Sequence, residues 1–204
     1  MCERPYLGAE FGWPRAACER SMSKASAYRG LVGAVADRGM TEAVARQLPE
    51  AARETFLQPP LSVTYIPSVH FHLVMKAIDA AGGHELLRDI GRDSILQGPV
   101  SMMRPLIEGT LRLFEASPAA FYKMMPKIIG NQAQDMTLRF EKTGARACEL
   151  LVQFDVFDHM PPRAWVYWEG VLLAIYDLCS VEGTCTATPT DDPRGRAAIF
   201  HCAW

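Results

Sequence analysis

Residues 136–156 read MTLRFEKTGARACELLVQFDV, and this stretch decides the fold class. Apolar and polar residues alternate on both sides of Thr143-Gly144. A period of two is typical of half-buried strands, and a glycine-containing break between two such runs predicts a turn. We therefore expect a β-hairpin here.

The residues after this hairpin predict a helix and then a second hairpin. Pro161-Pro162 precedes a run in which bulky apolar residues recur every three or four positions, as one buried face of a helix requires. From Glu182 to Trp204 the alternation returns on both sides of a polar turn. The C-terminal third thus predicts the element order ββαββ.

The first two thirds of the chain predict helices. Apolar residues recur at helical spacing in several segments, with Gly or Pro near their ends. These segments are 28–38, 41–56, 68–81, 86–95, 100–114 and 118–128. The fold class is therefore α+β, with a helical N-terminal two thirds packed on a small antiparallel sheet.

Composition excludes several functional classes. The chain has 204 residues, 49% of them hydrophobic, with 21 basic and 23 acidic residues. The near balance of charge gives no basic stripe for nucleic acid. Apolar runs end well before the roughly 20 residues that a membrane span needs. Six cysteines without a short repeated spacing are typical of free thiols in a reducing compartment, so we expect a cytoplasmic protein.

The beginning of the chain differs from the rest in pattern. Residues 1–25 lack both helical periodicity and the apolar core of a secretory signal, and Met22-Ser23-Lys24 resembles a translation start. We expect residues 1–25 to be a flexible arm and residues 26–204 to form a single domain.

Two kinds of site are suggested by residue type. His159, Glu182 and Cys185 carry the side chains that bind zinc, with packing of the cysteine as a small apolar residue as the alternative. His70 and His72 would lie on different sides of a helix and could not share one ion. The absence of nucleophile, nucleotide-binding and metalloprotease motifs gives no support for catalysis.

Methionine and aromatic residues suggest an apolar pocket between helices and sheet, with an ordinary filled core as the alternative. The candidate pocket residues are Met103, Phe114, Phe121, Met124, Met125, Trp165, Trp168 and Tyr176.

Several short motifs resemble a known group of proteins. They are Tyr28-Arg29-Gly30-Leu31, Ile90-Gly91-Arg92-Asp93, Trp168-Glu169-Gly170-Val171-Leu172 and the closing strand to Trp204. Together with the element order, they resemble the fold shared by vinyl-4-reductase domains, heme nitric-oxide-binding domains and Golgi transport-particle subunits. Within that group, residues 26–204 are most similar to a paralogous family abundant in myxobacteria.

The resemblance implies a ligand-sensing or protein-assembly module, often a dimer. The heme-binding branch depends on a proximal histidine and a Tyr-x-Ser-x-Arg motif, and the absence of that motif argues against heme. Vinyl-4-reductase domains carry a zinc site that Glu182-Gly183-Thr184-Cys185 matches in part, with His159 in place of the first thiolate and no cysteine in the fourth position.

The expected function is therefore a non-enzymatic sensor that binds an apolar or aromatic molecule, acts as a homodimer and signals to a downstream protein. An assembly module with a filled core is the main alternative. A weaker one is a tetrapyrrole-related enzyme.

Overall fold

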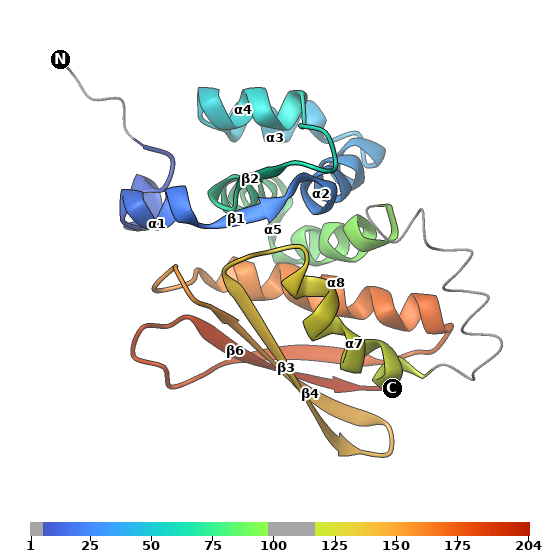
Figure 1. Cartoon of the computed structure of the whole chain (residues 1–204). Coiled ribbons are helices and arrows are strands. Elements are labelled where there is room, and N and C mark those ends of the chain that lie inside the picture. The colour runs from blue at the N-terminus through green and yellow to red at the C-terminus, as the bar shows by residue number, and fades with distance from the viewer. Residues whose placement is uncertain (1–5, 98–116) are drawn as a thin grey trace.

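The computed structural model describes residues 6–97 and 117–204 (Figure 1). The first part consists of η1 (Ala9–Phe11), α1 (Arg15–Arg20), β1 (Met22–Lys24), α2 (Ala25–Asp37), α3 (Thr41–Gln47), α4 (Glu50–Leu57), β2 (Tyr65–Pro67) and α5 (Val69–Gln97). The second part consists of α7 (Pro118–Gly130), β3 (Met136–Gly144), β4 (Ala147–Phe154), α8 (Pro162–Cys179), β5 (Thr184–Pro189) and β6 (Ala197–Ala203).

The second part is a four-stranded antiparallel sheet with α8 lying along it (Figure 1). Its strand order is β3-β4-β6-β5, so β5 is an edge strand. Alternate residues of β4 are buried, from Cys148 to Phe154, because one face of the sheet is covered. The α+β class and the predicted ββαββ order are confirmed.

The helical layer of the first part packs on the opposite side of α8 from the sheet (Figure 1). The contact between α5 and α8 is a close approach of two backbones. A Cβ atom on Gly170 would overlap the carbonyl oxygen of Arg88, and one on Gly91 would overlap that of Tyr167. Glycine is required at both positions because the helices approach closely there.

Glycine also explains the shape of α5. Gly83 has φ 75° and ψ −173°, so the helix kinks there and then continues to Gln97. The predicted helices 68–81 and 86–95 are the two halves of α5, separated by this kink.

Pro126 lies inside α7, which continues to Gly130. A proline commonly ends or kinks a helix, but Pro126 does not end α7. A proline removes one N–H, and the flanking turns keep their own hydrogen bonds.

Residues 6–24 are packed against the rest of the chain, in contrast to the predicted flexible arm over residues 1–25. Trp13 and Cys18 are buried, and the Trp13 indole N–H donates to the carbonyl of Asp158 at 2.8 Å. Strand β1 pairs with β2, and the Lys24 N–H donates to the carbonyl of Gln132 at 2.7 Å. These contacts are long-range, so sequence periodicity does not reveal them.

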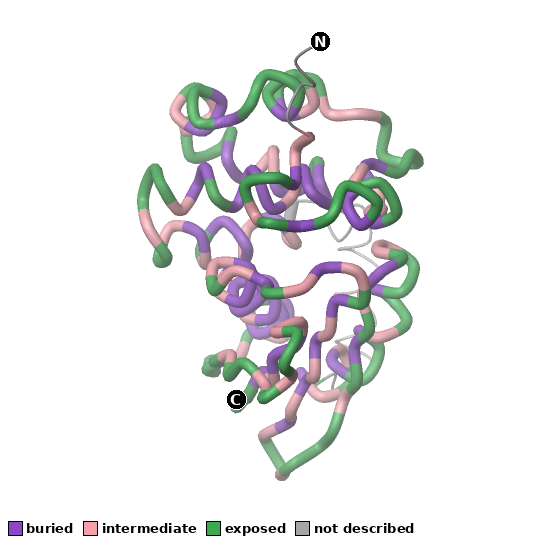
Figure 2. The backbone as a smooth tube through the Cα atoms, turned by 90° about the vertical axis from the view of Figure 1, so that its left-hand side faces the viewer, coloured by how far each residue is buried: buried purple, intermediate pink, exposed green. Residues whose placement is uncertain are grey.

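Buried positions run through both the helical layer and the sheet (Figure 2). Among the helices of the described ranges, none is long and apolar enough to cross a membrane.

Candidate functional site

The predicted pocket residues on α8 lie in the interior of the protein. Trp165, Trp168 and Tyr176 are all buried. The Trp165 ring lies 5.8 Å from that of Phe154 and 6.3 Å from that of Phe200. Aromatic side chains from helix and sheet therefore occupy the space between α8 and the strands.

Polar groups in this interior have partners. The Tyr176 hydroxyl donates to the carbonyl of Thr184 at 2.9 Å, and the Tyr122 hydroxyl donates to that of Leu172 at 3.1 Å. Buried polar groups with partners stabilise a unique packing. Both hydroxyls are therefore held by backbone carbonyls.

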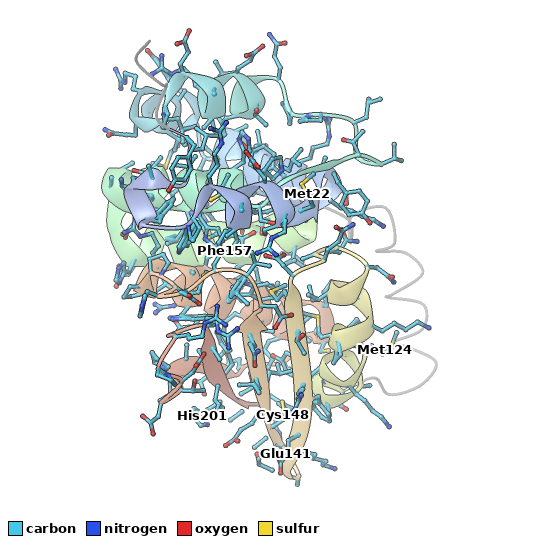
Figure 3. The ribbon with its side chains drawn as sticks, turned by 60° about the vertical axis from the view of Figure 1, so that its left-hand side comes forward. Met22, Met124, Glu141, Cys148, Phe157 and His201 are labelled. Atoms are coloured by element: carbon cyan, nitrogen blue, oxygen red, sulfur yellow. The ribbon has the colours of Figure 1, made fainter. Side chains whose placement is uncertain are left out.

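The predicted pocket residues on α7 face different ways. Met125 is buried and Phe121 is half-buried, whereas Met124 is 58% exposed and lies on the outer side of the helix (Figure 3). Met124 and Met125 therefore cannot line one cavity. Met103 and Phe114 lie outside the described residues.

The predicted zinc ligands are not brought together. His159 precedes α8 and Glu182 follows it, and a helix of 18 residues spans about 27 Å. Cys185 is buried on β5, whereas His159 and Glu182 are exposed. Within residues 6–97 and 117–204, no cluster of three histidine, cysteine, aspartate or glutamate side chains could hold a metal ion.

The most unusual buried group is His72, near the start of α5. Four aromatic rings surround its imidazole, with ring centroids 4.8 to 6.3 Å away: Phe11, Trp13, Phe154 and Phe157. We call these five residues the aromatic cage. Figure 3 labels Phe157 where the cage meets the C-terminal part.

The cage joins three distant parts of the sequence. Phe11 and Trp13 come from the N-terminal segment, His72 from α5, and Phe154 and Phe157 from the end of β4 and the loop after it. Trp13 stacks on Phe157 with centroids 4.1 Å apart and on Phe11 at 4.5 Å. The N-terminal segment therefore closes the cage from outside.

The His72 imidazole has an unpaired polar atom. His72 is 3% exposed, and its Nδ1 atom has no hydrogen-bond partner among the described residues. Burial, together with the nearby Arg163 guanidinium, lowers the pKa of His72 to about 3. His72 is thus a neutral imidazole whose Nδ1 atom makes no hydrogen bond to the described residues.

Two further buried polar atoms lie between α2 and α5. Neither the Tyr28 hydroxyl nor the Nδ1 atom of His70 has a hydrogen-bond partner within residues 6–97 and 117–204, and their rings are 6.4 Å apart. Burial lowers the pKa of His70 to about 4 and raises that of Tyr28.

A small pocket lies beside the cage. It has a volume of about 50 Å³, and its lining includes Glu10, Leu73 and Lys76, neighbours in sequence or space of Phe11 and His72. Pockets for drug-sized ligands measure roughly 300 Å³ or more. A ligand at the cage would therefore have to displace a side chain.

Comparisons with solved structures identify the fold. An oxygen-binding H-NOX domain related to soluble guanylate cyclases matches with a TM-score of 0.63 and 12% identity over 88% of this chain and 92% of its own. The Fe(II) unliganded H-NOX protein from K. algicida matches with a TM-score of 0.61 and 11% identity over 88% and 95%. The fold is that of H-NOX domains.

A third H-NOX structure, from a study of heme distortion, gives a TM-score of 0.65 and 12% identity over 89% of this chain and 94% of its own. At this identity the likeness shows the fold alone. No protein-family model matches the sequence, and no curated protein matches it. The relation to the heme nitric-oxide-binding fold is thus confirmed at the level of fold, while the likeness to the myxobacterial family stays a prediction.

Sequence reasoning missed the aromatic cage. It considered His72 only as a partner of His70 for a metal ion, and it placed Phe11 and Trp13 in a flexible arm. The available signal was the segment Phe11-Gly12-Trp13-Pro14, because two large aromatic residues in a short stretch are rarely left exposed.

Proposed function

We propose that this chain is a non-enzymatic sensor domain that binds a small aromatic molecule with a hydrogen-bonding group in the aromatic cage. The observation that carries the proposal is the unpaired Nδ1 atom of His72 inside a shell of aromatic rings. A buried polar atom without a partner destabilises a protein by about 1 to 3 kcal/mol. A ligand that supplies the missing hydrogen bond would recover this energy while its ring packs against the cage.

Trp13 would transmit the binding event. Its ring covers the cage, and its N–H holds the carbonyl of Asp158. A ligand ring that replaces Trp13 against Phe157 would release the N-terminal segment, including η1 and α1. Binding would therefore favour an open arrangement over the closed one and change the surface offered to a downstream protein.

Heme, which the H-NOX relatives suggest, does not fit the histidines of this chain. His84, His159 and His201 are exposed, and residues 98–116 contain no histidine. His72 is enclosed by rings, and His70 packs edge-on against Tyr28. A histidine-held porphyrin would require both packed regions to open. The proposal therefore involves a small organic molecule.

A pair of equally shaped probes tests the proposal. The compounds p-cresol and p-xylene differ by a hydroxyl in place of a methyl group. We expect p-cresol to raise the melting temperature of the full chain more than p-xylene does at the same concentration. A ligand at 100 times its dissociation constant stabilises a folded protein by about 2.7 kcal/mol.

The variant His72→Phe keeps the apolar cage and removes the hydrogen-bonding atom. It should respond equally to the two probes, whereas His84→Gln, at an exposed position, should respond like the wild type. Equal responses in the wild type, or none, would refute the proposed ligand class.

An exposed apolar segment favours a second function, that of an interaction module. Leu61, Val63 and Tyr65 are 74%, 82% and 41% exposed, at alternate positions leading into β2. Exposed apolar residues at an edge strand are typical of a contact with another chain. The predicted homodimer could use this surface, and light scattering of the wild type and of Val63→Lys would test it. A dimer that becomes a monomer in the variant supports this function, and a wild-type monomer contradicts it.

A further inference from the structure

Three cysteines lie side by side across the C-terminal sheet. Cys148 of β4 stands opposite Cys202 of β6, and Cys202 stands opposite Cys185 of β5. All three are buried and free, and Figure 3 labels Cys148 on its strand. A single buried cysteine packs as a small apolar residue, but neighbouring thiols within bonding reach can also react with each other.

The hydrogen-bond register shows how closely β5 and β6 bring their thiols together. The Thr190 N–H donates to the carbonyl of Ala197 at 3.0 Å, which makes these two residues a hydrogen-bonded pair. Such pairs alternate with non-hydrogen-bonded pairs in an antiparallel ladder. Cys185 and Cys202 lie an odd number of positions further along, so they form a non-hydrogen-bonded pair.

The register between β4 and β6 places Cys148 and Cys202 at the other kind of position in the ladder. The Trp204 N–H donates to the carbonyl of Arg146 at 3.0 Å, and Cys148 and Cys202 lie two positions along. Cys148 and Cys202 are therefore a hydrogen-bonded pair. Opposed Cα atoms are about 5.5 Å apart in such pairs and about 4.5 Å apart in non-hydrogen-bonded ones, where side chains come closer.

Geometry and position both favour reaction between Cys185 and Cys202. Their Sγ atoms are 3.4 Å apart. Strand β5 is at the edge of the sheet, whereas β4 lies inside it. An edge strand opens more readily, so a small oxidant reaches this pair more easily than it reaches Cys148.

Cys202 is the thiol that reacts first. Hydrogen bonding from the Cys148 and Cys185 thiols lowers the pKa of Cys202, and the same contacts raise the pKa of Cys148 and of Cys185. A thiolate in this row is therefore most stabilised at the middle sulfur. The thiolate is the nucleophilic form of cysteine.

We infer that Cys185 and Cys202 are a site of oxidative modification that forms a cross-strand disulfide when a small peroxide oxidises Cys202. The Cys202 thiolate attacks one oxygen of hydrogen peroxide, the O–O bond breaks, and the hydroxide that leaves takes up a proton. The Cys185 sulfur then attacks the resulting sulfenic acid, the S–O bond breaks, and water leaves. Two thiols and one peroxide thus give one disulfide and two waters.

The disulfide would fix the edge of the sheet. In the reduced protein, β5 is held by its ladder to β6 and by the Glu169 carboxylate, which accepts the Ala187 N–H at 2.9 Å. A covalent bond between β5 and β6 would slow the opening of this edge. The inference does not depend on the aromatic cage, which involves other residues.

Mass spectrometry of the full chain tests the inference. After treatment with a small excess of hydrogen peroxide, the intact mass should fall by two hydrogen atoms, and two of the six thiols should resist alkylation under denaturing conditions. Trypsin should then yield peptide 164–194 linked to peptide 197–204. Dithiothreitol should restore both thiols.

Fragmentation of the linked peptide must place the bond on Cys185 rather than Cys179, because both lie in peptide 164–194. The variant Cys179→Ser should keep the link, and Cys185→Ala should lose it. If Cys185→Ala fails to fold, the linked peptides of the oxidised wild-type chain alone show which cysteines are joined. A link to Cys148 or Cys179, a link between two chains, or six alkylated thiols after oxidation would overturn the inference.

Discussion

The interior between α8 and the sheet and the aromatic cage around His72 are both buried, yet their polar groups differ. In the first, the Tyr176 hydroxyl is bonded to the carbonyl of Thr184, and Glu169 accepts from Arg88 at 2.7 Å and from the N–H of Ala187. In the second, the Nδ1 atom of His72 has no partner among the described residues.

This difference distinguishes a region that stabilises the fold from a region where a ligand can bind. A region whose hydrogen bonds are all made gains stability from remaining as it is. A region that buries an unpaired atom is less stable than it would be with a partner, so a ligand can act there. We propose that the C-terminal core supports the fold and that the cage binds the ligand.

The largest expected effect comes from breaking the closure of the cage. Trp13→Ala removes a buried ring that stacks on Phe157 and Phe11. We expect the free energy of unfolding to fall by about 4 kcal/mol, the usual loss for a buried tryptophan. Urea denaturation measures it, with the exposed Met124→Ala as a control. A loss below about 1 kcal/mol would mean that the N-terminal segment is not packed in solution.

The next largest loss of stability is expected at the contact between α5 and α8. Gly170→Ala places a methyl group against the carbonyl of Arg88 and forces α5 and α8 apart. We expect a loss of about 3 kcal/mol, as for overpacking at a tight contact. Gly130→Ala, which meets nothing within 4 Å, should be neutral or slightly stabilising. Equal losses of stability in Gly170→Ala and Gly130→Ala would show that the backbones of α5 and α8 do not approach closely.

Acid should weaken the region with the unpaired histidines. The folded-state pKa values of His72 and His70, about 3 and 4, lie below the ordinary value, so the unfolded chain binds more protons as the pH falls below about 6.5. Stability is therefore present above that pH and decreases as the pH falls toward the folded pKa. One such histidine contributes a loss of about 2 kcal/mol between pH 7 and 5.

The variant His72→Gln should lose correspondingly less stability over this range, as followed by urea denaturation at each pH. His84→Gln, at an exposed position, should behave like the wild type. Burial raises the pKa of Asp135, which acts in the opposite direction in every variant, so the difference between variants isolates His72. An unchanged pH dependence in His72→Gln would contradict the neutral, buried state of this imidazole.

The smallest expected change of stability comes from removing the hydroxyl of a fully buried tyrosine, Tyr122 or Tyr28. Tyr122→Phe removes a hydroxyl that donates to the carbonyl of Leu172, whereas Tyr28→Phe removes one that has no partner in the described part of the chain. We expect the first to lose about 1 kcal/mol of stability and the second to lose none or gain slightly. Thermal denaturation distinguishes them. Equal losses would show that the Tyr28 hydroxyl has a partner in solution.

Local patterns in the sequence predict the fold better than the site. Alternation in residues 136–156 and helical spacing after Pro161 specify β3, β4 and α8, since each pattern reflects a face buried by the same element. Glycine near the predicted helix ends led us to expect two separate helices, 68–81 and 86–95, where α5 instead kinks at Gly83 and continues. The packing of residues 6–24 was not indicated by local patterns, because Trp13 finds its partners far along the chain at Phe157 and Asp158.

The candidate site residues show the same limit. Trp165 and Tyr176 were assigned to a pocket from residue type, and only the structure shows their contacts with the Phe154 ring and the Thr184 carbonyl. His159 and Glu182 were grouped by chemistry, but α8 separates them. The residues His72, Trp13 and Phe157 meet only in three dimensions, so no spacing in the sequence could predict the cage.

The most direct test of the central claim is a long-range ¹H–¹⁵N correlation spectrum of the histidine side chains, recorded with p-cresol and with p-xylene. We predict that p-cresol shifts the Nδ1 resonance of His72 toward values for a hydrogen-bonded imidazole, while p-xylene leaves it in place and His84 and His201 respond to neither. Equal shifts with both compounds, or an unchanged His72 resonance at saturating p-cresol, would contradict the account of the aromatic cage as a ligand site.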